Sequence, residues 1–296
     1  MEFSVCIPTY NRASYLKLAL DTVITQLGDN DELVIQDNCS QDNTESVVRS
    51  YLRDSRIKYF RNGENLGLIG NFRELVNNAT KEYVYLLTDD DFLLPNALDL
   101  CREFARKSKA KAFKTSYYIY NEKSNTGKLN KYFNLSLYPD DLDHEQIARI
   151  YQSAHTFTGL CFSRSLFDYD FFVKYGNVWY PSMLITGLAK SELGYLDKPT
   201  NVHVWENDTF WGIDPNRRDI LNDSQIDVLL FLWENNYIDR QLFPVMVKHH
   251  CLTNHNADNA RLHAYIGLRL RLKIKIHIWK REFLDSMVGV ASKILN

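Results

Sequence analysis

The sequence predicts an α/β protein, with a mainly parallel β-sheet flanked by helices and a mostly helical carboxyl-terminal region. The first observation is a regular alternation of strand-like and helix-like patterns over residues 1–120. The second is that each strand-like run ends in a polar loop rich in Asn and Asp. The third is the return of helical periodicity beyond Arg217. Strands that alternate with helical crossovers lie parallel in an open sheet.

The predicted elements of the first 120 residues follow one another without a break. The strands are short apolar runs, and the helices between them carry apolar residues at three- and four-residue spacing. Pro95 suits the first turn of a helix that begins there. The predicted strands are 3–8, 32–37, 57–62, 82–88 and 112–120, and the helices are 13–26, 41–52, 68–79 and the one from Pro95.

The pattern loosens from residue 121 onward. Residues 121–134 are polar and turn-rich, which predicts a loop, and residues 138–152 predict a capped helix. Aromatic segments follow as far as Trp211, after which helical periods return in 223–236 and 240–252. These helical segments account for the predicted character of the carboxyl-terminal region.

Composition argues against several classes of protein. The 296 residues are 45% hydrophobic with a net charge of −2, so overall charge gives no support for nucleic-acid binding. The five cysteines are scattered without a C-x-x-C pair, which fits a reducing cytosol rather than a zinc site. A signal-peptide pattern is absent, and no apolar run approaches the roughly 18 residues that span a bilayer. We therefore expect a cytoplasmic protein, attached to a membrane at most at its surface.

Four polar loops follow the first four predicted strands. Open α/β sheets bind ligands beyond the carboxyl ends of their strands, where the strand order switches. We therefore expect these loops to gather on one rim and to form a ligand site. They are P-T-Y-N-R (8–12), D-N-C-S-Q-D-N (37–43), N-G-E-N-L-G (62–67) and T-D-D-D (88–91).

Three adjacent carboxylates, Asp89, Asp90 and Asp91, end the apolar fourth strand. Neighbouring like charges repel one another unless something positive or polar offsets them. One interpretation is a solvated turn with a helix cap. The other is a site for Mg²⁺ or Mn²⁺, which prefer oxygen ligands and commonly take one or two carboxylates plus phosphate oxygens. The position on the ligand rim favours the cation site. The sequence contains no P-loop and no G-x-G-x-x-G motif after the first strand.

The four loop motifs, taken with C-I-P before the first, resemble those of family 2 glycosyltransferases over roughly residues 1–120. This resemblance implies the GT-A fold and transfer of a sugar from a nucleotide diphosphate donor to a hydroxyl acceptor, with Mn²⁺ or Mg²⁺ as cofactor. It also implies three regions along the chain. Residues 1–120 would form the donor-binding domain, 121–215 the rest of the catalytic domain with the acceptor site, and 216–296 a helical, basic extension.

The resemblance also assigns roles to individual residues. Asp37 would lie against the nucleotide base, Asp89 would face the ribose, and Asp90 would bind the metal, with Asp91 next to both. Asp91 is therefore a metal candidate and a catalytic candidate. The full nucleotide-binding set implied by the family pattern is Pro8, Thr9, Tyr10, Arg12, Asp37, Asn65, Asp89 and Asp90.

The sequence departs from the family pattern at the general base. Inverting members commonly place an acidic pair at the start of a helix after the sheet, but residues 176–194 contain no acid before Glu192. The identity of the base and the inverting or retaining outcome therefore stay open. Each candidate also has a structural interpretation, as a helix cap, a solvated acid or a buried histidine. The candidates are Asp140, Asp141, Asp143, His155, Glu206 and Asp208.

The pair Tyr180–Pro181 and the element N-D-T-F (207–210) resemble, less specifically, the abequosyltransferases of bacterial O-antigen assembly. This resemblance implies a CDP-linked 3,6-dideoxyhexose donor, with UDP- and dTDP-linked donors left open. It implies an oligosaccharide acceptor linked to a polyprenyl diphosphate. A dideoxy sugar has few hydroxyls, so its pocket should be aromatic and apolar. The candidate sugar-site residues are Tyr180, Trp205 and Trp211.

Residues 261–281 carry seven Lys or Arg and no acid. A basic surface that contacts anionic lipid at the inner face of the cytoplasmic membrane is the favoured interpretation. The alternative is an exposed edge element protected by lysines.

The sequence also leaves two rival functions open: a sugar nucleotidyltransferase, and a sugar-nucleotide-binding protein without catalysis.

Overall fold

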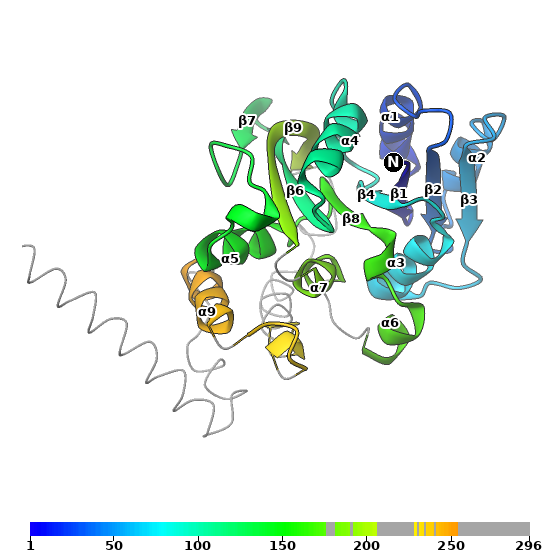
Figure 1. The fold of residues 1–296 in the computed structure, drawn as a ribbon. Helices are drawn as coiled ribbons and strands as arrows, with labels where there is room; N and C mark the ends of the chain where they lie inside the picture. The colour runs from blue at the N-terminus through cyan, green and yellow to red at the C-terminus, as the bar shows by residue number, and fades with distance from the viewer. Residues whose placement is uncertain are drawn as a thin grey trace, which may run out of the picture.

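The computed structural model describes residues 1–175, 181–189, 192–205, 228–229, 231–233, 235–239 and 241–253. Within these residues the strands form one nine-stranded sheet in the order β3-β2-β1-β4-β8-β6-β9-β5, with β7 paired to β6 (Figure 1). The sheet is parallel from β3 to β4 and mixed beyond that point. The predictions made from the sequence for residues 176–180, 206–227 and 254–296 fall outside these described residues.

The amino-terminal half confirms the predicted alternation of strands and helices. Its helices turn apolar faces to the sheet: in α1, Leu16, Leu20 and Val23 are fully buried at three- and four-residue spacing. Element ends differ from the prediction by a few residues, since capping and turn contacts decide them. The bounds are β1 Phe3–Thr9, α1 Ala13–Ile24, β2 Glu32–Asp37, α2 Thr44–Arg49, β3 Ile57–Arg61, α3 Gly67–Asn78 and β4 Tyr83–Leu86.

The second half completes the sheet and covers it. The predicted fifth strand is β6, which does not pair with β4, because the antiparallel strand β8 lies between them. Two antiparallel steps make β6, and β9 after it, point the same way as β1. The bounds are β5 Phe92–Leu93, α4 Ala97–Ser108, β6 Ala112–Asn121, β7 Thr126–Asn130, α5 His144–Ser153, β8 Leu160–Ser163, α6 Tyr169–Tyr175, α7 Pro181–Leu188, β9 Leu193–Trp205 and α9 Leu242–Thr253, with 3₁₀ turns at Pro139–Asp141 and Arg164–Leu166.

The loop predicted at 121–134 is wrong in part, because it contains β7. This strand pairs antiparallel with β6 from Asn121–Thr126 to Tyr117–Asn130. Asn125 has φ 53°, a left-handed conformation that suits the tight turn between them. An exposed edge strand satisfies its backbone through β6 and buries little, so it needs no apolar alternation.

Alternating side chains of the central strands supply two apolar layers. Val5 and Ile7 point to the layer under α1 and α4, whereas Cys6 points to the layer shared by α3, α5 and α7. The predicted helix 240–252 corresponds to α9, which packs beside α5 in that second layer (Figure 1). Among the described residues no helix is both long enough and apolar enough to cross a bilayer.

Candidate active site

The carboxyl ends of β1, β2, β4 and β9 meet on one rim of the sheet. This follows from the parallel registers of β1 with β2 and β4, and from the direction of β9. The rim carries the predicted Arg12, Asp37 and acidic turn, and His203 on β9. His203 has no counterpart in the predicted set. The period-two alternation of N-V-H-V-W (201–205) could have identified a strand that places the polar His203 at the rim.

Asp91 is the most enclosed of the three acids, with a fully buried side chain. One of its oxygens accepts hydrogen bonds from the backbone N–H of Val204 (2.9 Å) and the other from the hydroxyls of Thr88 (2.6 Å) and Thr158. His203 Nδ1 lies 3.1 Å from both oxygens. Asp91 therefore ties the acidic turn to β9 and to the segment before β8.

The charges of Asp91 and His203 support each other. Burial by itself would raise the pKa of Asp91, but His203 and the two hydroxyls outweigh it and hold the pKa below its ordinary value. Burial would likewise lower the pKa of His203, but Asp91 outweighs burial and raises it. Each group therefore stabilises the charged form of the other.

Thr158 is positioned by a turn that requires glycine. Gly159 has φ +78°, and a Cβ atom there would stand 2.5 Å from the Thr115 hydroxyl oxygen and 2.7 Å from Asn201 Oδ1. On the other side of this turn, the buried Lys114 ammonium donates to the carbonyl oxygens of Thr156 (2.9 Å) and Thr158. Burial lowers the pKa of Lys114 to about 7. Lys114 fixes the backbone that presents Thr158 to Asp91.

Arg12 offsets the other two acids of the turn. Its guanidinium lies 3.1 Å from Asp90 Oδ2 and 4.0 Å from Asp89 Oδ1. Burial, together with the charge of Asp90, raises the pKa of Asp89 to about 7, although Thr9 and Arg12 oppose the shift. The turn thus sends its acids in separate directions, because successive side chains cannot all face one point.

Asp37 ends β2 with a fully buried carboxylate. It accepts hydrogen bonds from the Tyr59 hydroxyl (2.7 Å) and the Ser40 backbone N–H (2.8 Å), and Arg61 Nε lies 3.6 Å away. Burial and the bond to Asp37 raise the pKa of Tyr59 well above its ordinary value. These partners fix the Asp37 carboxylate at the carboxyl end of β2.

A buried amide network carries the loops on β2 and β3, and the sequence prediction included only one member. Asn62 donates to Asn38 (3.0 Å) and to Asn71 (2.9 Å), and accepts from Gln36 (2.8 Å). Asn38 in turn donates to the predicted Asn65 (2.7 Å). The oxygen of Asn65 is therefore used inside the protein. Recurrent Asn residues after successive strands were the available signal.

The P-T-Y-N-R loop is joined to the loop after β2. The backbone N–H of Asn11 donates to the Ser40 hydroxyl (2.9 Å), and Gln41 donates its N–H to Asn11 Oδ1 (2.7 Å). Tyr10 beside it is 42% exposed. Pro8 and Thr9 belong to β1 itself, and Thr9 is buried. The loops after β1 and β2 thus lie side by side at the rim, where Thr9 and Asp37 are themselves buried.

The base candidates other than His155 separate into three groups. Asp143 caps α5 by accepting from the Gln146 N–H (2.7 Å), and Gln146 completes a capping box. Asp140 and Asp141 lie near the amino-terminal end of β9, because Leu137 bridges Tyr195 there, so the structure does not bring them to the rim. Glu206, Asp208, Tyr180 and Trp211 lie outside the described residues, as does the side chain of Trp205.

His155 is the base candidate at the rim end of α5, three residues before Thr158. Its Nδ1 donates to the Gln152 carbonyl oxygen (2.8 Å), which leaves the lone pair of the neutral ring on Nε2. His155 is exposed to solvent, with protein atoms around part of its ring. That desolvation lowers the pKa of His155, and the nearby charges of Lys114 and His203 lower it further, although the bond to Gln152 opposes the shift.

The donor set at the rim has the chemistry of a hard divalent cation site. Carboxylates suit Mn²⁺ or Mg²⁺, and phosphate and water commonly supply the remaining ligands. Within the described residues, no three His, Cys, Asp or Glu side chains form a ready-made metal cluster. The oxygens of Asp91 are already engaged within the protein, since they accept hydrogen bonds from Val204, Thr88 and Thr158.

Solved structures share this fold. The chain superposes on 93% of its length with Staphylococcus aureus TarS 1-349 in complex with UDP-GlcNAc, at a TM-score of 0.69, 16% identity and 78% coverage of that chain. The mannosyltransferase PcManGT from Pyrobaculum calidifontis, in complex with GDP-Man and Mn²⁺, gives a TM-score of 0.59 at 16% identity, with 93% and 79% coverage. These likenesses confirm the predicted GT-A fold.

Residues 4–171 match the family model described as Glycosyl transferase family 2. The chain belongs to this family, as the four loop motifs predicted. A Campylobacter jejuni GalNAc(5)-diNAcBac-PP-undecaprenol beta-1,3-glucosyltransferase is 36% identical over 114 residues, 38% of this chain and 37% of the relative. Abequosyltransferase RfbV of Salmonella typhimurium is 35% identical over 108 residues, 35% of this chain and 32% of the relative. The chain thus spans about a third of the length of these curated relatives.

Proposed function

We propose that this protein transfers a sugar from a nucleoside diphosphate donor to a hydroxyl of a saccharide acceptor, with a divalent cation at the acidic turn. The observation that carries the proposal is the meeting of Arg12, Asp37 and the acidic turn on one rim of a family 2 glycosyltransferase fold. Carboxylates at such a rim can bind a metal ion and can accept hydrogen bonds from the N–H groups of a nucleotide base.

The donor would lie across the rim from Asp37 to the acidic turn. The buried carboxylate of Asp37 would accept a hydrogen bond from the nucleotide base, and Asp89 would face the ribose. Asp90 and Asp91, with His203, would hold Mn²⁺ or Mg²⁺. When bound, the cation would neutralise charge on the departing nucleoside diphosphate. The Arg12 guanidinium would hold Asp90 in place and keep positive charge beside the phosphates.

His155 is our choice for the base that accepts the proton of the attacking acceptor hydroxyl. A lowered pKa keeps its ring neutral near pH 7, and the bond to Gln152 directs the lone pair to Nε2. The test is the pH profile of kcat/KM. The wild-type protein should lose activity below the pKa of His155, and a His155→Gln variant should lose at least 100-fold in kcat together with that acidic limb. An unchanged profile would assign the base elsewhere, for example to Asp208.

The relatives support a lipid-linked saccharide as acceptor. The printed name of the Campylobacter relative contains an undecaprenol-linked saccharide, and a second relative is an abequosyltransferase. We propose a polyprenyl-diphosphate-linked oligosaccharide, in surface polysaccharide synthesis at the inner face of the cytoplasmic membrane. Residues 261–281 would supply the membrane contact. Vesicles with and without anionic lipid would test that contact by co-sedimentation.

The decisive experiment is nucleotide release from a panel of sugar nucleotides that includes UDP-, dTDP-, GDP- and CDP-linked sugars, CDP-abequose among them. We expect metal-dependent release that Asp90→Ala reduces about 100- to 1,000-fold without a change in circular dichroism. Pyrophosphate formation from a nucleoside triphosphate would identify a nucleotidyltransferase instead. Donor binding with no turnover under any acceptor would identify a non-catalytic binding protein.

A further inference from the structure

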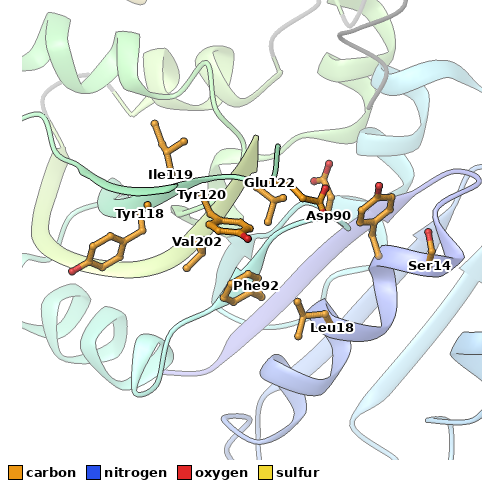
Figure 2. Close-up of a pocket in the computed structure, with 12 residues that line it drawn as sticks. Ser14, Leu18, Asp90, Phe92, Tyr118, Ile119, Tyr120, Glu122 and Val202 are labelled. Atoms are coloured by element: carbon orange, nitrogen blue, oxygen red, sulfur yellow. The ribbon is translucent and has the colours of Figure 1, made fainter. Parts of the chain in front are cut away.

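A cavity of about 430 Å³ opens beside the acidic turn, on the side of the sheet that faces α1 (Figure 2). Its walls come from four places: α1, the end of the acidic turn with β5, the last residues of β9, and the β6–β7 hairpin. Its volume lies within the roughly 300–1,000 Å³ of pockets that hold small ligands. Among the residues that line the cavity, only Asp90 has a role in the proposed function.

The floor of the cavity is an apolar and aromatic surface set by strand register. Tyr118 of β6 lies opposite Val202 of β9, which lies opposite Phe92 of β5. Tyr120 lies opposite Val204 in the same way. Residues directly opposite one another across paired strands point to the same face, so these five side chains form one continuous surface. Figure 2 shows the rings of Tyr120 and Phe92 beside Val202.

The facing wall and the rim of the cavity are mixed in character. Leu18 of α1, 51% exposed, faces Phe92, and Tyr118 is 38% exposed. The lining also includes the acids Asp90 and Glu122 and the hydroxyl-bearing Ser14. Aromatic faces with a few carboxylates and a hydroxyl beside them match a pyranose, which has an apolar C–H face and hydroxyls around its edge.

The cavity is connected to the proposed donor site through one residue. Arg12 lies 3.1 Å from Asp90 and places its guanidinium carbon 5.1 Å from the centre of the Tyr15 ring, which lines the cavity. A ligand in the cavity is thus one side chain away from the phosphates in the proposed function. A simple apolar chain fits the opening poorly, because it would remove water from two carboxylates without giving them hydrogen bonds.

We propose that this cavity is a saccharide-binding subsite that receives one or two sugar units of the acceptor. The inference rests on the proposed function for its biological role, since it places the acceptor beside the donor. Stacking on Tyr118 and Tyr120 supplies affinity, and the carboxylates of Asp90 and Glu122 accept hydrogen bonds from sugar hydroxyls. The subsite therefore selects acceptors by the units adjacent to the attacked hydroxyl.

The test measures saccharide binding without nucleotide, so it is independent of turnover. Saturation-transfer NMR on the full chain would use methyl glucoside, methyl galactoside, N-acetylglucosamine and chitobiose at millimolar concentration. We expect a signal from at least one of them in wild type. Tyr118→Ala and Tyr120→Ala should each weaken it at least tenfold, whereas Tyr118→Phe, which keeps the ring, should stay within about threefold. Phe60→Ala, an exposed aromatic on the edge strand β3, is the matched control and should bind as wild type.

Three results would overturn the subsite. The first is no signal from any saccharide in wild type. The second is equal saccharide signals in wild type and Tyr118→Ala. The third is a wild type that binds farnesyl phosphate instead of the saccharides and loses that binding in Tyr118→Ala. Thermal unfolding of each variant separates a lost site from a lost fold. Release of nucleotide from the sugar-nucleotide panel without acceptor is measured in parallel. That release should be unchanged in Tyr118→Ala, so failure of the subsite and failure of the proposed transfer are seen separately.

Discussion

His203 Nδ1 lies 3.1 Å from both carboxylate oxygens of Asp91, although 112 residues separate the two in the sequence. The contact joins the end of β9 to the acidic turn after β4. It places an imidazole ring against a fully buried carboxylate beside the predicted metal site. Several expectations for the site depend on this pair.

Replacing His203 by Ala should reduce sugar transfer by about 100-fold and weaken the dependence on Mn²⁺. The buried Asp91 would lose its positive partner, so its pKa should rise toward the protonated form. Transfer rates at a series of Mn²⁺ concentrations provide the measurement. His155→Ala is the matched comparison, because it should lower the rate without changing the metal dependence. Equal metal dependence in both variants would remove His203 from the cation site.

Replacing Arg12 by Gln should weaken nucleoside diphosphate binding about tenfold, which is about 1.4 kcal/mol. Arg12 opposes the repulsion between Asp89 and Asp90, so its loss should also raise the pKa of Asp89 above about 7. Arg12→Lys should restore only part of the affinity. Lys keeps the positive charge, but it lacks the planar guanidinium that binds phosphate through two hydrogen bonds. Calorimetric titration with CDP and UDP would measure these affinities. Unchanged affinity in Arg12→Gln would place the phosphates elsewhere.

Lys114 should make stability depend on pH above neutrality. Burial lowers its pKa to about 7, below the ordinary value of about 10.4. Between these two values the unfolded chain binds more protons than the folded chain, so the free energy of unfolding rises with pH. The rise should be up to about 1.4 kcal/mol per pH unit. This gain in the free energy of unfolding is lost again as the pH falls toward 7.

A Lys114→Met variant isolates this contribution. It removes the titrating group and leaves the carbonyl oxygens of Thr156 and Thr158 without their donor, which costs about 1–3 kcal/mol. Urea unfolding of both proteins at pH 7 and pH 9 gives the comparison. The advantage of wild type over the variant should be about 2 kcal/mol larger at pH 9. The same advantage at both values would show that Lys114 is charged throughout.

Asp143→Ala should cost about 1 kcal/mol of folding stability, because it removes the cap of α5. Turnover per folded molecule should not change. Asp140→Ala is the matched control, since Asp140 is exposed and caps no helix, and it should change neither quantity. Chemical unfolding and transfer assays at 20 °C would measure both. A large loss of turnover in Asp143→Ala would return this acid to the list of bases.

Much of the fold was predictable because its signals are local. Apolar runs and helical periods in the first 120 residues identified strands and helices, and the four polar loops identified the rim. The order of strands was not predictable, since the pairing of β4 with β8 depends on contacts made long after β4 in the sequence. Strand β7 was missed because an exposed strand owes its form to pairing with β6, and carries no apolar pattern of its own.

The sequence by itself determined the family, the α/β alternation and the acidic turn, because short motifs at fixed spacing encode them. Only the tertiary structure decided how the three acids differ. Asp91 turns inward to His203, Thr158 and Val204, whereas Asp90 meets Arg12 and opens onto the aromatic cavity. The reason is physical: the ionisation of a carboxylate depends on burial and on the charges around it. Those charges come from strands and turns that are distant along the chain.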